Sequence, residues 1–223
     1  MSDDQTPQPK VKVMPNGPLM VSGSVPLRNK KPIMSEHGEP LTWQTEVPVE
    51  TRATYALCRC GASSNKPFCD GTHSKNDFDG TETATTDEYE QSRTSYPGTG
   101  IEVFDDRAIC VHAGFCGNQV SNVWKMSPKT DDTQVRAQVM AMIERCPSGA
   151  LTYEVNGQAV EPDLPTEVSI TPDGPIWVSG GIPVERSDGQ PMETRNRVTL
   201  CRCGHSANKP LCDGSHKEAG FSG

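Results

Sequence analysis

The chain has 223 residues, of which 33% are hydrophobic and 5% aromatic, and its formal net charge is −8. A chain this poor in apolar residues has little material for one large core, so small modules held together by another device suit it better. The negative charge argues against general binding to nucleic acid or to an acidic membrane surface.

Nine cysteines are available as that device. The first residues, MSDDQTPQPK, lack the apolar stretch of a signal peptide, and no run approaches the ~20 apolar residues of a membrane span. We therefore expect a cytoplasmic protein, in which thiols stay reduced and clustered cysteines bind metal.

Residues 1–9 are expected to form a flexible terminus, followed by a first unit over roughly 10–82. Short β-branched segments bounded by Gly and Pro predict strands within NGPLMVSGSVPL (16–27) and at 54–57. The second strand leads into CRCGASSNKPFCDGTH, from Cys58 to His73. Asp70 is predicted to cap a short helix that begins at the following residues.

The middle of the chain, roughly 83–163, has a different character. Residues 101–103 alternate like a strand. Between 131 and 145, apolar residues recur at helical spacing and predict one amphipathic helix: Val135, Val139, Met142 and Ile143.

The last unit, roughly 164–223, repeats the first. DGPIWVSGGIPV (173–184) echoes NGPLMVSGSVPL, a strand is expected at 197–200, and CRCGHSANKPLCDGSH runs from Cys201 to His216. Twelve of the sixteen motif positions are identical, and Asp213 matches Asp70 as a predicted helix cap. The gap before the motif is fourteen residues longer in the first copy, so part of Lys30–Glu46 is predicted to be an insertion.

Each repeat spaces its potential metal ligands as C-x-C-x8-C-x3-H. Zinc accepts three cysteines and one histidine in structural sites. A [2Fe–2S] cluster also takes four protein ligands, and histidine in place of cysteine raises its reduction potential. The spacing alone leaves both metals open.

The pattern C-x-C-x2-[ST]-x3-P-x-C-D-G-[ST]-H resembles the signature of the CDGSH iron–sulfur (mitoNEET-like) family, and both copies carry every element, including Ser63, Ser206, Pro67 and Pro210. The resemblance covers a little over half of the chain. It implies two [2Fe–2S] clusters, with the ligands Cys58, Cys60, Cys69 and His73 in the first copy and Cys201, Cys203, Cys212 and His216 in the second.

Relatives of this family pair two motifs across a homodimer, with exchanged strands forming a β-cap. With both motifs on one chain, the resemblance implies a small, loop-rich α+β fold in which two CDGSH modules form an intramolecular pseudo-dimer. We expect a monomer.

Between the repeats, ICVHAGFC followed by ERCPSGAL resembles a small bacterial ferredoxin. Cys110, Cys116 and Cys146 match its ligands, but Ala113 stands at the second ligand position. The resemblance implies a ferredoxin-like α+β insert with a [3Fe–4S] cluster, or a [4Fe–4S] cluster if His112 completes it. The alternative is a relic fold that keeps three free thiols.

Other residues give weaker signals. His205 and His37 are expected on solvated loops. Lys66, Lys209, Arg59 and Arg202 either offset the charge of the metal sites or lie plainly on the surface. The tryptophans at 43, 124 and 177 are expected in packing roles.

The leading hypothesis is a protein that transfers electrons or clusters to an unidentified redox or acceptor protein and has no catalytic site of its own. An outer ring nitrogen on each ligand histidine would couple reduction to protonation. The alternatives are a zinc-binding structural or interaction module and an electron-relay subunit of an oxidoreductase.

Overall fold

A computed structural model describes residues 8–223; of the predicted flexible terminus, residues 1–7 lie outside the described part. The fold is α+β, strand-rich and rich in loops, as predicted. The strands are β1 (Lys10–Val13), β2 (Leu19–Ser22), β3 (Leu27–Met34), β4 (Pro40–Thr45), β5 (Thr54–Leu57), β6 (Thr94–Pro97), β7 (Glu102–Asp105), β8 (Leu151–Val155), β9 (Gln158–Val160), β10 (Glu167–Ile170), β11 (Ile176–Ser179), β12 (Val184–Glu185) and β13 (Arg197–Leu200). The helices are α1 (Tyr89–Ser92), α2 (Val123–Met126) and α3 (Thr133–Glu144), with short 3₁₀ helices η1 (Thr72–Ser74), η2 (Arg107–Ile109) and η3 (Ser127–Lys129).

The two repeats exchange strands. One sheet has the order β12-β1-β2-β5 and the other β13-β11-β10-β3-β4, so each joins strands of both repeats. β1 pairs with β12 in parallel, with Val11 opposite Val184, and β10 pairs with β3 in parallel, with Val168 opposite Leu27. Each repeat therefore contributes its third strand to the partner sheet, which is the intramolecular pseudo-dimer predicted from the sequence.

The exchanged sheets share one hydrophobic core. Alternate residues of β1 and β2 point inward, and β10, β11 and β13 are buried along their whole length. The core is built from aliphatic side chains of both repeats, among them Val11, Leu19, Leu57, Val168, Ile176 and Leu200. Because neither repeat supplies enough apolar area for a core of its own, the exchange of strands is what makes these short sheets stable.

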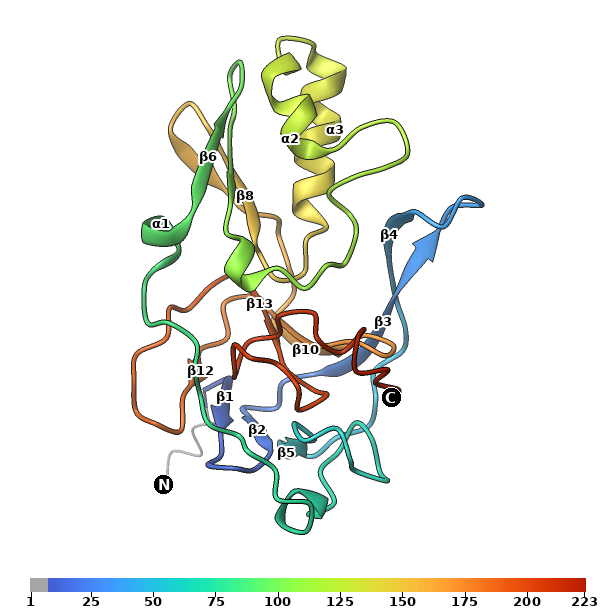
Figure 1. Ribbon diagram of the computed structural model, residues 1–223, viewed down its shortest axis with the longest axis vertical. Helices are drawn as coiled ribbons and strands as arrows, with labels where there is room; N and C mark the ends of the chain where they lie inside the picture. Colours follow the sequence, from blue (N-terminus) through green and yellow to red (C-terminus); the bar gives the residue numbers. More distant parts are fainter. Residues whose placement is uncertain (1–7) are drawn as a thin grey trace, which may run out of the picture.

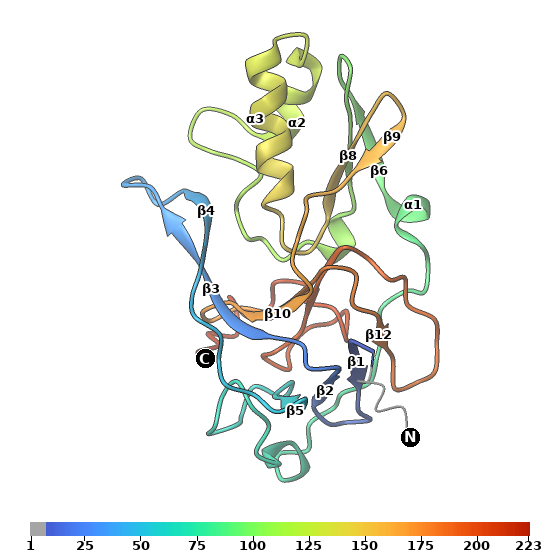
Figure 2. The same cartoon turned by 180° about the vertical axis from the view of Figure 1, so that it is seen from behind.

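The predicted insertion in the first repeat is a long hairpin of β3 and β4, whereas the equivalent strand β12 has two residues. In Figures 1 and 2 this hairpin leaves the sheets and rises beside the loop that precedes α2. Trp43 anchors it: the indole Nε1 donates to the carbonyl of Arg145 at 2.9 Å, and the ring packs against Phe115 and Trp177. The hairpin thus links the first repeat to the middle of the chain.

The middle of the chain, hereafter the insert, forms a second layer above the repeats (Figure 1). Its sheet has the order β6-β7-β8-β9, and α2 and α3 pack on it around a separate hydrophobic cluster. The predicted amphipathic helix is confirmed as α3, with Val139, Met142 and Ile143 buried and the Asp132 side chain accepting from the amides of Gln134 and Val135. Within residues 8–223, no helix is long and apolar enough to cross a membrane.

Candidate metal centres

Each ligand set begins where a buried strand ends. Cys58 follows β5 and Cys201 follows β13. The amide of Cys58 donates to Pro67 O and that of Cys201 to Pro210 O, both at 2.8 Å. The amides of Cys69 and Cys212 donate back to the strands, to Ala56 O and Thr199 O at 2.9 and 3.0 Å. These paired bonds fold the loop onto its own strand and bring the third cysteine beside the first.

Side chains inside the loop close it in the same way in both repeats. Ser63 Oγ donates to Phe68 O, and Ser206 Oγ donates to Leu211 O, each at 2.7 Å. Lys66 Nζ donates to Ser63 O and Lys209 Nζ to Ser206 O, each at 2.9 Å. Both lysine–proline peptide bonds in these loops are cis. The two lysines therefore brace the loops, a role that the spacing of the motif did not reveal.

The prediction that Asp70 and Asp213 cap helices is wrong, and a short helix follows only Asp70. The first repeat has only the three-residue η1, whose N-cap is Gly71, and the second has turns. The reason is local: Gly71 and Gly214 adopt φ of +87° and +90°, which ends regular helical geometry. Both carboxylates still accept from an amide two residues on, at 3.0 Å, and so fix the turn that carries the histidine.

The four ligands of each set lie as two close pairs. In the first ligand set, Cys58 Sγ and Cys60 Sγ are 3.7 Å apart, and Cys69 Sγ and His73 Nδ1 are 3.4 Å apart. The second ligand set repeats this, with 3.8 Å between the sulfurs of Cys201 and Cys203 and 3.4 Å between Cys212 Sγ and His216 Nδ1. Across residues 8–223, no three Cys, His, Asp or Glu side chains gather closely enough to hold one metal ion together.

The second ligand set is deeply buried, and burial together with contacts between its thiols shifts their pKa values. A hydrogen bond from Cys203, against the opposing effect of burial, lowers the pKa of Cys201 to about 6, and the same contact raises the pKa of Cys203. Burial raises the pKa of Cys212 to about 12, and charges on Cys201, Asp213 and Cys110 of the insert add to this shift. The contact between the two thiols therefore favours a thiolate on Cys201 over one on Cys203.

Arg59 and Arg202 are not surface residues. Arg59 is 1% exposed and donates to the carbonyls of Met14, Gly17 and Gly80 at 2.9–3.0 Å. Arg202 is 2% exposed and bonds the carbonyl of Gly223. Burial lowers the pKa of Arg202 to about 10, and thiolate charge at Cys58 of the other repeat opposes that shift. Each buried cation therefore ties its ligand loop to other segments of its own repeat, and each is influenced by thiolate charge in the opposite set.

The two ligand loops touch at the pseudo-twofold axis. A Cβ on Gly61 would come within 2.4 Å of Cys203 O, and a Cβ on Gly204 within 2.9 Å of Cys60 O. A groove alongside is lined by the same four residues together with the equivalent Phe78 and Phe221. Glycine is thus required at both positions, because the backbones approach too closely for any side chain.

The insert thiols, Cys110, Cys116 and Cys146, lie near one another and half-buried. Burial raises the pKa of Cys116, and the neighbouring thiolates of Cys146 and Cys110 raise it further. Ala113 supplies no ligand atom, as the sequence indicated. His112 was the other predicted ligand, but its ring lies against Gly214 of the second repeat, and it is the backbone amide of His112 that donates to Cys110 Sγ at 3.4 Å.

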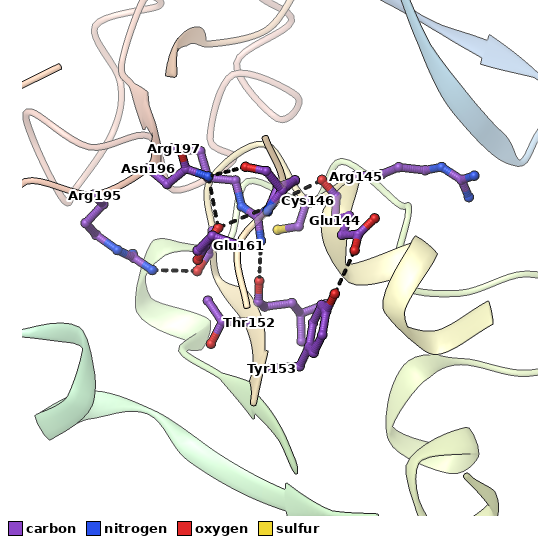
Figure 3. A network of polar contacts seen from close by, with 12 residues as sticks. Glu144, Arg145, Cys146, Thr152, Tyr153, Glu161, Arg195, Asn196 and Arg197 are labelled. Carbon is purple, nitrogen blue, oxygen red and sulfur yellow. Dashed lines mark hydrogen bonds and ion pairs between the residues drawn. The ribbon is translucent and has the colours of Figure 1, made fainter. Parts of the chain in front are cut away.

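A buried arginine joins the insert to the second repeat, and sequence reasoning missed it. Arg197 of β13 is 1% exposed; its guanidinium donates to Glu144 O and Leu151 O, at 3.2 and 3.0 Å, and lies 3.6 Å from a Glu161 carboxylate oxygen (Figure 3). The same close-up places Cys146 beside this network. The only sequence signal was its position in a strand four residues before Cys201, where the first repeat has Thr54.

The remaining predicted residues have plain surroundings. His37 and His205 are exposed, and the amide of His205 donates to Cys203 Sγ at 3.4 Å. Trp177 is buried at 3% exposure, and Trp124 Nε1 donates to Asp105 Oδ2 at 3.0 Å. The three tryptophans therefore do pack, as expected.

Known families match all three parts of the chain. A family model described as "Iron-binding zinc finger CDGSH type" matches residues 16–74 and 173–217. The chain belongs to this CDGSH family. A second model, "Divergent 4Fe-4S mono-cluster", matches residues 96–156, between the two CDGSH regions. Together the matches make this an iron–sulfur cluster-binding protein.

Two curated bacterial relatives are similar to part of the chain. The "Uncharacterized protein YjdI" of Escherichia coli strain K12 is 37% identical over 62 residues, an alignment that covers 26% of this chain and 80% of YjdI. The protein of the same name from Escherichia coli O157:H7 matches to the same extent.

Proposed function

We propose that the protein holds one [2Fe–2S] cluster in each ligand set and serves in electron transfer or cluster transfer, without a substrate of its own. The observation that carries the proposal is the arrangement of each set as a Cys–Cys pair and a Cys–His pair. A single zinc ion requires all four ligands around one point. Two pairs suit a centre with two irons, one bound by two thiolates and the other by a thiolate and an imidazole.

The donor chemistry fits this group. Each set supplies three thiol sulfurs and one imidazole nitrogen on a loop that its own hydrogen bonds keep closed. Buried cations, Arg59 and Arg202, lie near the thiols and balance thiolate charge. When bound, such a cluster supplies one-electron redox chemistry. The protein's own contribution is to position the ligands, and to leave a proton on the outer nitrogen of the histidine when the surroundings favour it.

Two measurements test the proposal. Protein produced with ample iron should be red-brown and contain iron and acid-labile sulfide in amounts that fit two [2Fe–2S] clusters, plus any cluster of the insert. It should accept and return electrons reversibly when reduced with dithionite and reoxidised. Stoichiometric zinc without sulfide would favour the zinc module instead.

One observation also favours the electron-relay subunit. Cys110 of the insert lies near enough to the second ligand set for its charge to raise the pKa of Cys212. A cluster in the insert would then have a neighbour for electron exchange within the chain. We propose a cluster of three irons there, because Ala113 cannot ligate and the imidazole of His112 is turned toward Gly214. A near-isotropic EPR signal of the oxidised protein would support three irons. Its absence, with a four-iron signal after reduction, would favour the four-iron alternative.

A further inference from the structure

The insert covers the second ligand set at its histidine end. The His112 ring lies so close to Gly214 that a Cβ on this glycine would come within 2.7 Å of His112 Cδ2. Lys217 Nζ, next to His216, donates to His112 O at 2.5 Å. Asn208 Nδ2 donates to Ala108 O at 2.9 Å. On the insert side, these three contacts come from the short stretch around Cys110.

The first residues of the insert cover the same loop from another direction. The amides of Thr83 and Ala84 both donate to Lys209 O, at 2.7 and 2.9 Å, and Thr83 Oγ1 donates to Ala207 O at 2.7 Å. The second ligand loop is thus held by two parts of the chain outside its own repeat.

The first ligand set has almost the same sequence but different surroundings. A Cβ on Gly71 would meet no atom within 4 Å, in contrast to Gly214. Cys69 and His73 are partly exposed, whereas Cys212 and His216 are 2% and 6% exposed. Because the two loops close in the same way, the contacts with the insert are what set the second ligand set apart from the first.

Side chains of the first loop bond within their own repeat. Ser64 donates to the Asp70 carboxylate through both its amide and its hydroxyl, at 2.9 and 2.8 Å. The equivalent position in the second loop is Ala207, which keeps only the amide bond, to Asp213 at 2.8 Å. The first loop is therefore self-sufficient and leaves its histidine turn accessible to another protein.

We propose that the two sets have separate roles: the first ligand set is the exchange port of the molecule, and the insert insulates the second as an internal centre. This inference rests on the proposed function. The partner that fits the port is an acceptor protein with free thiolates. In each exchange step an acceptor thiolate forms a bond to iron as the bond to His73 or Cys69 breaks. The displaced group takes up a proton from solvent, and no electron changes hands.

The test follows each set separately in the full-length, cluster-loaded protein. The protein is challenged with EDTA, samples are pulsed with iodoacetamide over time, and alkylated cysteines are assigned by peptide mass spectrometry. Cys58, Cys60 and Cys69 report the first set, and Cys201, Cys203 and Cys212 report the second. The two hydrogen bonds from the stretch around Cys110, at ordinary strength, correspond to roughly a tenfold slower opening. We therefore expect the second set to be alkylated about tenfold more slowly than the first.

Three variants isolate the cover. His112→Ala and Asn208→Ala remove contacts with the insert and should accelerate alkylation of the second set severalfold, with no change at the first. Asn65→Ala is the matched control. The backbone amides of Asn65 and Asn208 both donate to a serine hydroxyl at 3.0 Å, but Asn65 is exposed and belongs to the first loop, which the insert does not cover. It should change neither rate.

The outcomes separate the two proposals. Iron and sulfide in the loaded protein, with equal rates at the two sets or a faster second set in the parent protein, would overturn the exchange-port inference alone. Zinc without sulfide in the loaded protein would overturn the proposed function and the exchange role together. The comparison within the parent protein needs no variant, so a variant that fails to fold does not remove the test.

Discussion

Replacing Arg197 should loosen the joint between the insert and the second repeat. In Arg197→Met the apolar stem is kept, but the carbonyls of Glu144 and Leu151 lose their donors in a buried place, and Glu161 loses its cation. Each buried carbonyl that is left without a donor lowers the free energy of unfolding by about 1–3 kcal/mol. The Glu161 side chain is about one-third exposed, so the loss of its ion pair with Arg197 adds little to the destabilisation. We expect the free energy of unfolding to fall by about 3 kcal/mol, which for a chain of this size lowers the Tm by roughly 6–12 °C.

Thermal unfolding followed by far-ultraviolet circular dichroism, at matched iron content, measures this effect. Arg52→Met is the control, since Arg52 is exposed and its replacement removes the same charge. We expect the control to shift the Tm by no more than about 2 °C. Equal Tm values for the two variants would refute the reasoning, because the hydrogen bonds of the buried Arg197 guanidinium would then add nothing to stability beyond the effect of its charge.

Three further predictions concern the site and its pH dependence. His73→Cys and His216→Cys should each lower the reduction potential of their own cluster and let it persist to lower pH. A thiolate adds negative charge, and the substitution removes an imidazole nitrogen for which protons compete with iron in acid. Redox titration and visible absorption check both. Gly61→Ala should cost more stability than Gly71→Ala, because both have a positive φ but only the first meets a backbone oxygen, at 2.4 Å; their Tm values decide. Burial raises the pKa of Asp105, so its charge opposes folding above the unfolded-state pKa. Asp105→Asn should therefore raise the urea midpoint at neutral pH and have little effect near pH ~4.

The sequence was sufficient to predict the repeats and their strands. The segments at 54–57 and 197–200 are strands with those bounds, and the duplicated upstream segments contain the equivalent strands β2 and β11. These features follow from local pattern and duplication, which a sequence records directly. Both predicted ligand sets lie inside the two regions that the family model matches, and their role as ligands stays a prediction.

What the sequence did not predict depends on contacts between distant segments. The sequence around Arg59 and Arg202 does not reveal whether these side chains are buried or exposed, because their acceptors are backbone carbonyls of other segments. The helix caps at Asp70 and Asp213 failed because a left-handed glycine follows each of them. The asymmetry of two nearly identical loops cannot be read from either loop, since it arises where His112 of the insert meets Gly214.

The central claim is that each ligand set holds two irons in different surroundings. Mössbauer spectroscopy of the full-length protein enriched in the iron isotope, before and after reduction, tests it most directly. The arrangement in pairs predicts two iron environments in equal amounts from these sets, with the ferrous signal appearing on the imidazole-bound iron, which carries less negative charge. A single iron environment in the oxidised protein would contradict this arrangement. It would also be contradicted if the protein carried zinc and gave no iron signal beyond that of the insert.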